Sequence, residues 1–118
     1  MSEHFLVQSI LIQFGARPDL RLWRVNTGAA KDPKSGALIR FGLPGMADIS
    51  GILAPLGRRI EIECKSPTGR QSEAQIKWQR MIEKHGGLYV LARSTEDVAR
   101  SLPVIASASS GCTPDTSQ

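Results

Sequence analysis

Charged and apolar side chains alternate strictly through the sequence IEIECK at residues 60–65. Such alternation is typical of a β-strand, because successive side chains of a strand point to opposite faces of the sheet. A second β-prone run covers residues 48–53, and the segment between the two runs is short enough for a hairpin. We therefore expect antiparallel strands over residues 48–53 and 58–65, the second with one core face and one charged face.

Apolar residues at helical spacing predict further helices. The expected helices cover residues 2–15, 72–85 and 94–102. Ser2 is a suitable N-cap for the first helix, and Ser72 with Gln75 three residues later forms a capping box at the start of the second. One face of the second helix is apolar and should pack on the core. This face comprises Ala74, Trp78, Met81 and Ile82.

The remaining segments complete the order of the elements. Residues 20–25 and 88–92 favour strands, whereas residues 27–45 have the composition of loops or of a loose hairpin. A strand, helix, strand crossover through residues 72–85 implies a parallel pair, and the preceding hairpin implies antiparallel pairs. The expected fold class is therefore α/β, with a small mixed β-sheet flanked by helices.

The length of 118 residues, with 41% hydrophobic and 22% charged residues, is that of one folded domain. We expect residues 1–103 to form this domain and residues 104–118 to be a disordered polar tail. Cys64 and Cys112 lie in dissimilar settings, and we expect both to be reduced. No secretory leader opens the sequence and no stretch approaches about 18 apolar residues, so we expect a cytoplasmic protein without a membrane segment.

Asp48 and Glu63 are candidates for one metal site. They are 15 residues apart, and the predicted hairpin returns Glu63 to the side of Asp48. Two converging carboxylates repel each other unless a cation lies between them, and such oxygen ligands favour Mg²⁺ or Mn²⁺. Lys65 shares the strand face of Glu63, about 6.6 Å further along, where it can reach a water or a phosphate oxygen. An isolated E-x-K sequence is also typical of a strand with a solvated charged face. The position of Asp48 beside Glu63 favours a metal site over that interpretation.

Two segments carry a resemblance to a known family. GLPGMADISG at residues 42–51 and EIECKSPTGRQS at residues 61–72, followed by Gln75, resemble the VRR-NUC (virus-type replication-repair nuclease) branch of the PD-(D/E)XK superfamily. The resemblance covers roughly residues 2–92 and implies a restriction-endonuclease-like core. Ala47 replaces the proline that gives the superfamily its name, but this proline supplies no ligand.

The resemblance assigns roles to the candidate residues. It implies that Asp48, Glu63 and the backbone carbonyl of Cys64 bind Mg²⁺ or Mn²⁺. It implies that Lys65 orients or polarises the attacking water. The expected catalytic set is therefore Asp48, Glu63, Lys65 and Gln75.

Other residues near the site have competing interpretations. The resemblance implies a site role for Gln75, but a glutamine at this position of a capping box also returns to the N-cap amide, and the two roles can exclude each other. It implies that Glu3 completes the metal site, whereas an acid near a helix N-terminus equally complements the helix dipole. For Glu61 we expect a salt bridge to Arg58 or Arg59 rather than catalysis.

The net charge of +4 is matched by one segment, because residues 17–40 carry six basic and two acidic residues. A positive balance is compatible with a polyanionic partner and with an ordinary basic protein. Together with the resemblance, it implies contacts to the phosphates of DNA. The expected phosphate contacts are Arg24, Lys31, Lys34, Arg40, Arg70 and Lys77.

The resemblance implies a DNA endonuclease that depends on Mg²⁺ or Mn²⁺ and needs no organic cofactor. Stand-alone members of the family are common in phages and prophages, which places the protein in the cytoplasm of a bacterial host. They resemble Holliday-junction resolvases, and a symmetric four-way junction needs two cuts related by a two-fold axis, so we expect a homodimer that acts on branched DNA. Cleavage of flaps, nicks or plain duplex, and a non-catalytic DNA-binding module with the same fold, are the alternatives.

Overall fold

The computed structural model describes residues 2–26 and 28–103. Along the chain these residues form α1 (Glu3–Phe14), β1 (Leu20–Arg24), β2 (Gly28–Lys31), β3 (Leu38–Phe41), β4 (Ile49–Leu53), β5 (Arg58–Cys64), α2 (Glu73–Lys84), β6 (Leu88–Ala92) and α3 (Thr95–Ser101). Four strands form one sheet in the order β1-β4-β5-β6, and β2 and β3 form a separate two-stranded sheet. The predicted tail, which includes Cys112, lies outside the described residues.

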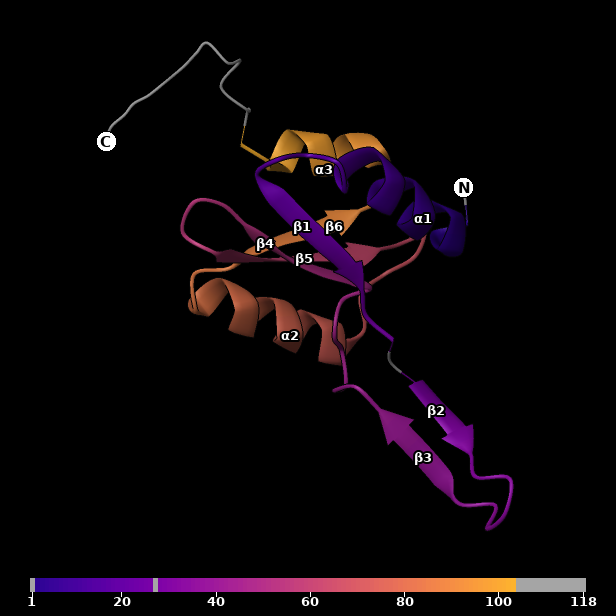
Figure 1. Cartoon of the computed structure of the whole chain (residues 1–118). Helices are drawn as coiled ribbons and strands as arrows, with labels where there is room; N and C mark the ends of the chain where they lie inside the picture. Colours follow the sequence, from indigo (N-terminus) through magenta and orange to yellow (C-terminus); the bar gives the residue numbers. More distant parts are fainter. Residues whose placement is uncertain (1, 27, 104–118) are drawn as a thin grey trace.

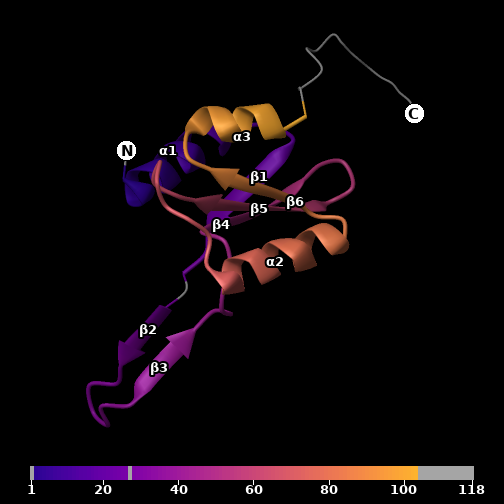
Figure 2. The same ribbon diagram turned by 180° about the vertical axis from the view of Figure 1, so that it is seen from behind.

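The main sheet is mixed, as predicted. β4 pairs antiparallel with both β1 and β5, so the two β-prone runs form the expected hairpin. β5 pairs parallel with β6, and α2 makes the crossover between them. Figures 1 and 2 show α1 and α3 over one face of the sheet and α2 over the other. The fold is therefore a small mixed α/β fold.

The helices begin where the sequence predicts. Ser2, Ser72 and Ser94 are the N-caps, and each accepts a backbone N–H with its hydroxyl oxygen. The capping box of α2 is complete, because the Gln75 side chain also accepts the Ser72 N–H. Within residues 2–26 and 28–103, no helix is long and apolar enough to span a membrane.

Both faces of β5 are buried. Ile60, Ile62 and Cys64 are 0% exposed and pack into the main core, which α1, β6 and α3 complete. On the other face, Glu61 and Glu63 are 0% and 2% exposed. Both carboxylates contact side chains of α2. The charged face of β5 is therefore covered by a helix rather than solvated.

The outer part of α2 is more open than predicted. Ile82 is buried with Ala47 and Tyr89, and Trp78 packs against this cluster. Met81 is 37% exposed, so its prediction as a core residue is wrong. Met81 instead lines an open groove, because no further element covers this flank of α2 in the described part of the chain.

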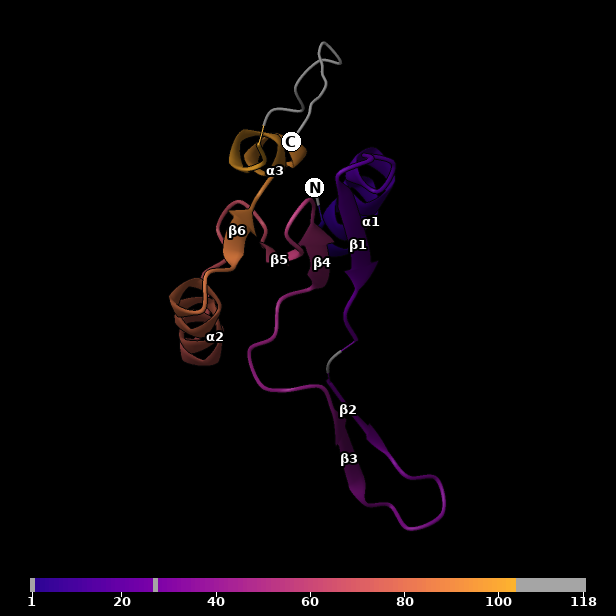
Figure 3. The ribbon, with the colours of Figure 1, turned by 60° about the vertical axis from the view of Figure 1, so that its left-hand side comes forward.

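Residues 28–41 form a hairpin arm, consisting of β2, β3 and their turn. This confirms the hairpin alternative for the glycine-rich segment. All of β2 is exposed, and in β3 the side chains of Leu38 and Ile39 are 58% and 50% exposed. Figure 3 shows the arm projecting away from the main sheet and from all the helices. At its base, the Val25 N–H donates to the Asp48 carbonyl at 2.8 Å, so the chain leaves and returns at the same point.

Candidate active site

The β4–β5 hairpin brings Asp48 and Glu63 together, as predicted. The register pairs Ile49 with Ile62, which places Asp48 opposite Glu63. Opposite residues of an antiparallel pair lie on the same face of the sheet. The Asp48 Oδ2 also accepts the Cys64 N–H at 2.8 Å, which fixes the carboxylate against β5.

Glu63 has one partnered and one unpartnered carboxylate oxygen. Its Oε2 accepts the Gln75 Nε2–H at 3.1 Å and lies 3.7 Å from the Lys65 Nζ. Its Oε1 is buried and has no hydrogen-bond partner in the described part of the chain. Burial without a partner is unfavourable for a carboxylate oxygen, and either a bound cation or a proton shared with Asp48 would satisfy Oε1.

Burial and charge repulsion act together on Glu63. Burial, together with the nearby negative charge of Asp48, raises the pKa of Glu63 to about 8, although the charge of Lys65 opposes the rise. The folded protein therefore holds a proton on Glu63 near neutral pH unless a cation takes its place. Two facing carboxylates with a free buried oxygen fit a hard divalent cation with oxygen ligands, such as Mg²⁺ or Mn²⁺.

Gln75 takes part both in the capping box and in the site, the two roles that the sequence left as alternatives. Its Oε1 accepts the Ser72 N–H at 2.8 Å, which completes the capping box. Its Nε2 donates to Glu63 at 3.1 Å. The two roles are compatible because they use opposite ends of one carboxamide, and the cap itself aims the donor at Glu63.

Lys65 is held beside Glu63 by the turn that follows it. The Lys65 N–H donates to the Ala92 carbonyl at 2.9 Å, and its side chain is 12% exposed. A Cβ on Gly69 would lie 3.5 Å from the Lys65 Cδ, so the turn packs on the lysine side chain. Arg93 donates from its Nη1 to the carbonyls of Ser66 and Gly69, each at 2.7 Å, and so closes this turn.

Cys64 contributes its backbone rather than its thiol to this region. The side chain is fully buried, and burial raises the pKa of the thiol to about 12. A thiol that stays protonated is a poor nucleophile and a poor metal ligand. The Cys64 N–H holds Asp48, and the metal-binding role of the Cys64 carbonyl stays a prediction.

Glu3 lies at the start of α1 and is exposed. Its negative charge is the smallest of the contributions that raise the pKa of Glu63, so it is near the site. Within residues 2–26 and 28–103, no three His, Cys, Asp or Glu side chains are grouped to hold a metal ion. The structure therefore brings Asp48 and Glu63 together, and the metal role of Glu3 stays a prediction.

Glu61 lies next to the site but has its own partners. Its Oε2 accepts the Arg59 Nε–H at 2.8 Å, which confirms one of the two salt bridges predicted for it. Arg58 instead donates to the Gly86 carbonyl. The Glu61 Oε1 accepts the Trp78 Nε1–H at 2.7 Å. Unlike Glu63, Glu61 has both oxygens partnered, which indicates a structural role.

Sequence reasoning missed two contacts of the site. Arg93 follows β6, and its contacts with the turn after Lys65 span 24 and 27 residues of chain. Trp78 contacts Glu61 across 17 residues. The available signal for Trp78 was its place on the apolar face of the helix, three residues after Gln75. For Arg93, a basic residue directly after a buried strand gives no specific signal.

The predicted phosphate contacts lie in two groups. Arg24 ends β1, while Lys31, Lys34 and Arg40 lie on the hairpin arm. Arg70 and Lys77 lie just before and within α2. The side chains of all these residues are exposed. The structure thus places cations on both sides of the loop of residues 42–46 that leads to Asp48.

No protein-family model matches the chain, and a search of the curated proteins finds no match.

Proposed function

We propose that this protein is a Mg²⁺- or Mn²⁺-dependent DNA endonuclease of the VRR-NUC type, with a PD-(D/E)XK core. The observation that carries this proposal is the buried Glu63 Oε1, which has no partner in the described residues and lies beside Asp48. Lys65 lies at 3.7 Å from the same carboxylate. A pair of acids that can hold a divalent cation, with an adjacent lysine, is suited to phosphodiester hydrolysis, because the cation and the lysine can stabilise the charge that develops on the phosphate.

Each residue of the site has a distinct task in this proposal. Asp48, Glu63 and the Cys64 carbonyl would hold the cation, which when bound supplies charge neutralisation and lowers the pKa of a water. Gln75 keeps the Glu63 carboxylate oriented through its hydrogen bond. Lys65, restrained by the turn that packs on it, would donate to the attacking water or to a phosphate oxygen.

The substrate in this proposal is branched DNA, and the protein acts as a homodimer in the bacterial cytoplasm. The exposed cations of α2 and of the projecting arm would hold the sugar-phosphate backbone on either side of the cleaved bond. Two copies are required for paired cuts in a four-way junction because each chain contributes one such site. No membrane and no organic cofactor enter the mechanism.

The test is a cleavage assay with labelled four-way junction, flap and plain duplex, each with Mg²⁺, Mn²⁺ or EDTA. Asp48→Ala and Lys65→Met should abolish cleavage, while Arg100→Gln, on the opposite side of the sheet, should retain it. Cleavage that survives Asp48→Ala or EDTA would refute the metal mechanism. Equal cleavage of all substrates would refute selectivity for junctions, and DNA binding without any cleavage would indicate a non-catalytic module.

A further inference from the structure

We propose that the loop of residues 42–46 separates the two halves of a nucleotide-binding site, one for a phosphate and one for an unpaired base of the DNA. This inference rests on the proposed function and specifies the substrate that the site selects. The phosphate half is the cavity beside Arg40, and the base half is the groove beside Trp78 and Met81. Pro44 lines both.

The base half is an aromatic and apolar groove of about 610 Å³. It lies between Pro44 and the flank of α2 that carries Trp78 and Met81. The Trp78 indole N–H already donates to Glu61 at 2.7 Å, so the carbon atoms of the ring are what Trp78 offers to the groove. A partly exposed indole beside a polarizable thioether is a suitable stacking surface for a nucleobase.

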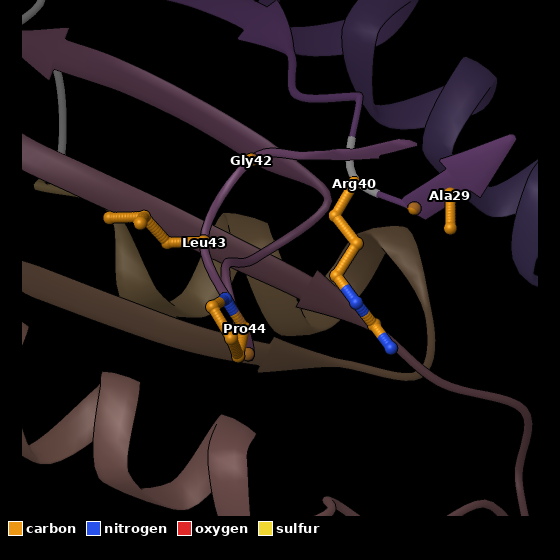
Figure 4. Close-up of a pocket in the computed structure, with 7 residues that line it drawn as sticks. Ala29, Arg40, Gly42, Leu43 and Pro44 are labelled. Atoms are coloured by element: carbon orange, nitrogen blue, oxygen red, sulfur yellow. The ribbon is translucent and has the colours of Figure 1, made fainter. Parts of the chain in front are cut away.

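The phosphate half is a cavity of about 300 Å³ in which Arg40 is the charged residue. Gly42 and Gly45 form part of its wall, so the backbone is accessible to a ligand there. Figure 4 shows the Arg40 side chain extending from β3 beside the loop that carries Pro44, while the Leu43 side chain points to the opposite side. Among the described residues, no carboxylate pairs with Arg40, which leaves its charge for an anion.

Both halves are close to the acids of the active site. Gly45 is three residues before Asp48, so their Cα atoms are at most about 11 Å apart. Ala74 lines the groove and directly precedes Gln75, which donates to Glu63. The bound nucleotide would therefore lie within about three nucleotides of the phosphate that is cleaved, given a rise of about 3.4 Å per nucleotide in each strand.

The loop that separates the two halves is fixed in place. Gly45 has φ +81°, and a Cβ on it would lie 2.2 Å from the Ala74 carbonyl oxygen. This close approach packs the loop on the first turn of α2. The site is therefore preformed, which lowers the entropic cost of ordering a ligand.

The chemistry favours a nucleotide over an apolar peptide as the occupant. An apolar segment would fill the groove but would leave the adjacent Arg40 without a partner, whereas a nucleotide supplies a base and an anion joined by a short sugar. Lys77, on the rim of the groove, adds a second cation, next to one acid, Glu73. A base in an intact duplex is stacked and paired, so only an unpaired or extruded base can enter the groove.

The experiment uses the full chain in EDTA, so that binding is measured without cleavage. A fluorescent adenine analogue, 2-aminopurine, replaces one unpaired base next to the branch point of a flap, and the paired position of a matched duplex serves as the DNA control. Fluorescence anisotropy of a remote dye reports binding of each DNA. Stacking in the groove should quench 2-aminopurine at the unpaired position and leave the paired one unchanged.

Three variants test the two halves. Met81 and Arg40 are both at exposed positions. Met81→Glu should weaken binding of the branched DNA by about 5- to 150-fold and abolish the quenching. Arg40→Gln should weaken binding by about 5-fold. Trp78→Phe keeps a ring in the groove and should retain part of the quenching. Arg100→Gln, on α3, is the matched control and should behave as the wild type.

Each outcome separates the inference from the proposed function. Quenching that is equal in wild type and Met81→Glu, or that is the same at paired and unpaired positions, would overturn the nucleotide site even if cleavage of DNA is established. Quenching that depends on Met81, and binding that depends on Arg40, without any metal-dependent cleavage would support the nucleotide site and refute the nuclease.

Discussion

Glu63→Gln should stabilise the metal-free protein although it removes a proposed metal ligand. Glu63 is 2% exposed, and burial together with the charge of Asp48 raises its pKa from 4.5 to about 8. Below pH 4.5 the side chain is protonated in both the folded and the unfolded state. As the pH rises towards 8, the unfolded chain releases this proton while the folded protein keeps it, so the free energy of unfolding falls.

The size of this loss follows from the two pKa values. A tenfold change in proton affinity corresponds to about 1.4 kcal/mol, so the rise from 4.5 to about 8 corresponds to at most about 5 kcal/mol. About 3 kcal/mol of this is lost by pH 7. Glutamine has a similar shape, keeps an acceptor for Gln75 and does not titrate, so the variant escapes the loss.

The assay is urea unfolding in EDTA at several pH values between about 4.5 and 8, with tryptophan fluorescence as the readout of unfolding. The stability of Glu63→Gln relative to the wild type should increase steadily across this range. Asp19→Asn is the matched control, because the hydrogen bond and charge of Arg17 lower the pKa of Asp19, so Asp19 stays ionised in both states over this range and the stability of the variant relative to the wild type should not change with pH. A Glu63→Gln stability difference that does not change with pH would refute the reasoning.

Gly45→Ala should lower the free energy of unfolding by about 2–4 kcal/mol in urea titrations, because the added Cβ would clash with the Ala74 carbonyl oxygen. Gly36 has a similar positive φ, but a Cβ there would meet no atom within 4 Å, so Gly36→Ala should lower the free energy of unfolding by only about 1 kcal/mol. Trp78→Phe should cost about 1–3 kcal/mol in the same assay because it leaves the buried Glu61 Oε1 without its donor. Arg93→Met should lower kcat for DNA cleavage by about 10-fold or more with little change in KM, because it releases the turn that positions Lys65. Equal losses at the two glycines, an unchanged Trp78→Phe stability, or a change confined to KM would contradict these expectations.

The local parts of the fold and site were predictable from the sequence. The alternation at residues 60–65 and the short connection before it predicted the hairpin, and the hairpin alone places Asp48 opposite Glu63. The capping box of Gln75 was predictable for the same reason, since its residues are three apart.

The covering of the second face of β5 was not predictable in this way. The alternation of apolar and charged residues predicts that Glu61 and Glu63 share a face of the strand, but it does not predict which element covers that face. The answer depends on where the crossover helix packs, and the Trp78 and Gln75 side chains that cover these acids come from that helix. The exposure of Met81 has the same cause, because helical spacing does not reveal how far the neighbouring elements extend.

The hairpin arm also has a consequence for how the chain tolerates change. Arg24 and Ile49 are paired in adjacent strands, and the Val25 N–H donates to the Asp48 carbonyl at 2.8 Å. The intervening segment is therefore an insertion between two neighbouring strand ends, and its length can vary without moving either end. Variants with a shorter or longer arm between residues 28 and 41 would keep Asp48 in the same place while changing the exposed surface next to it.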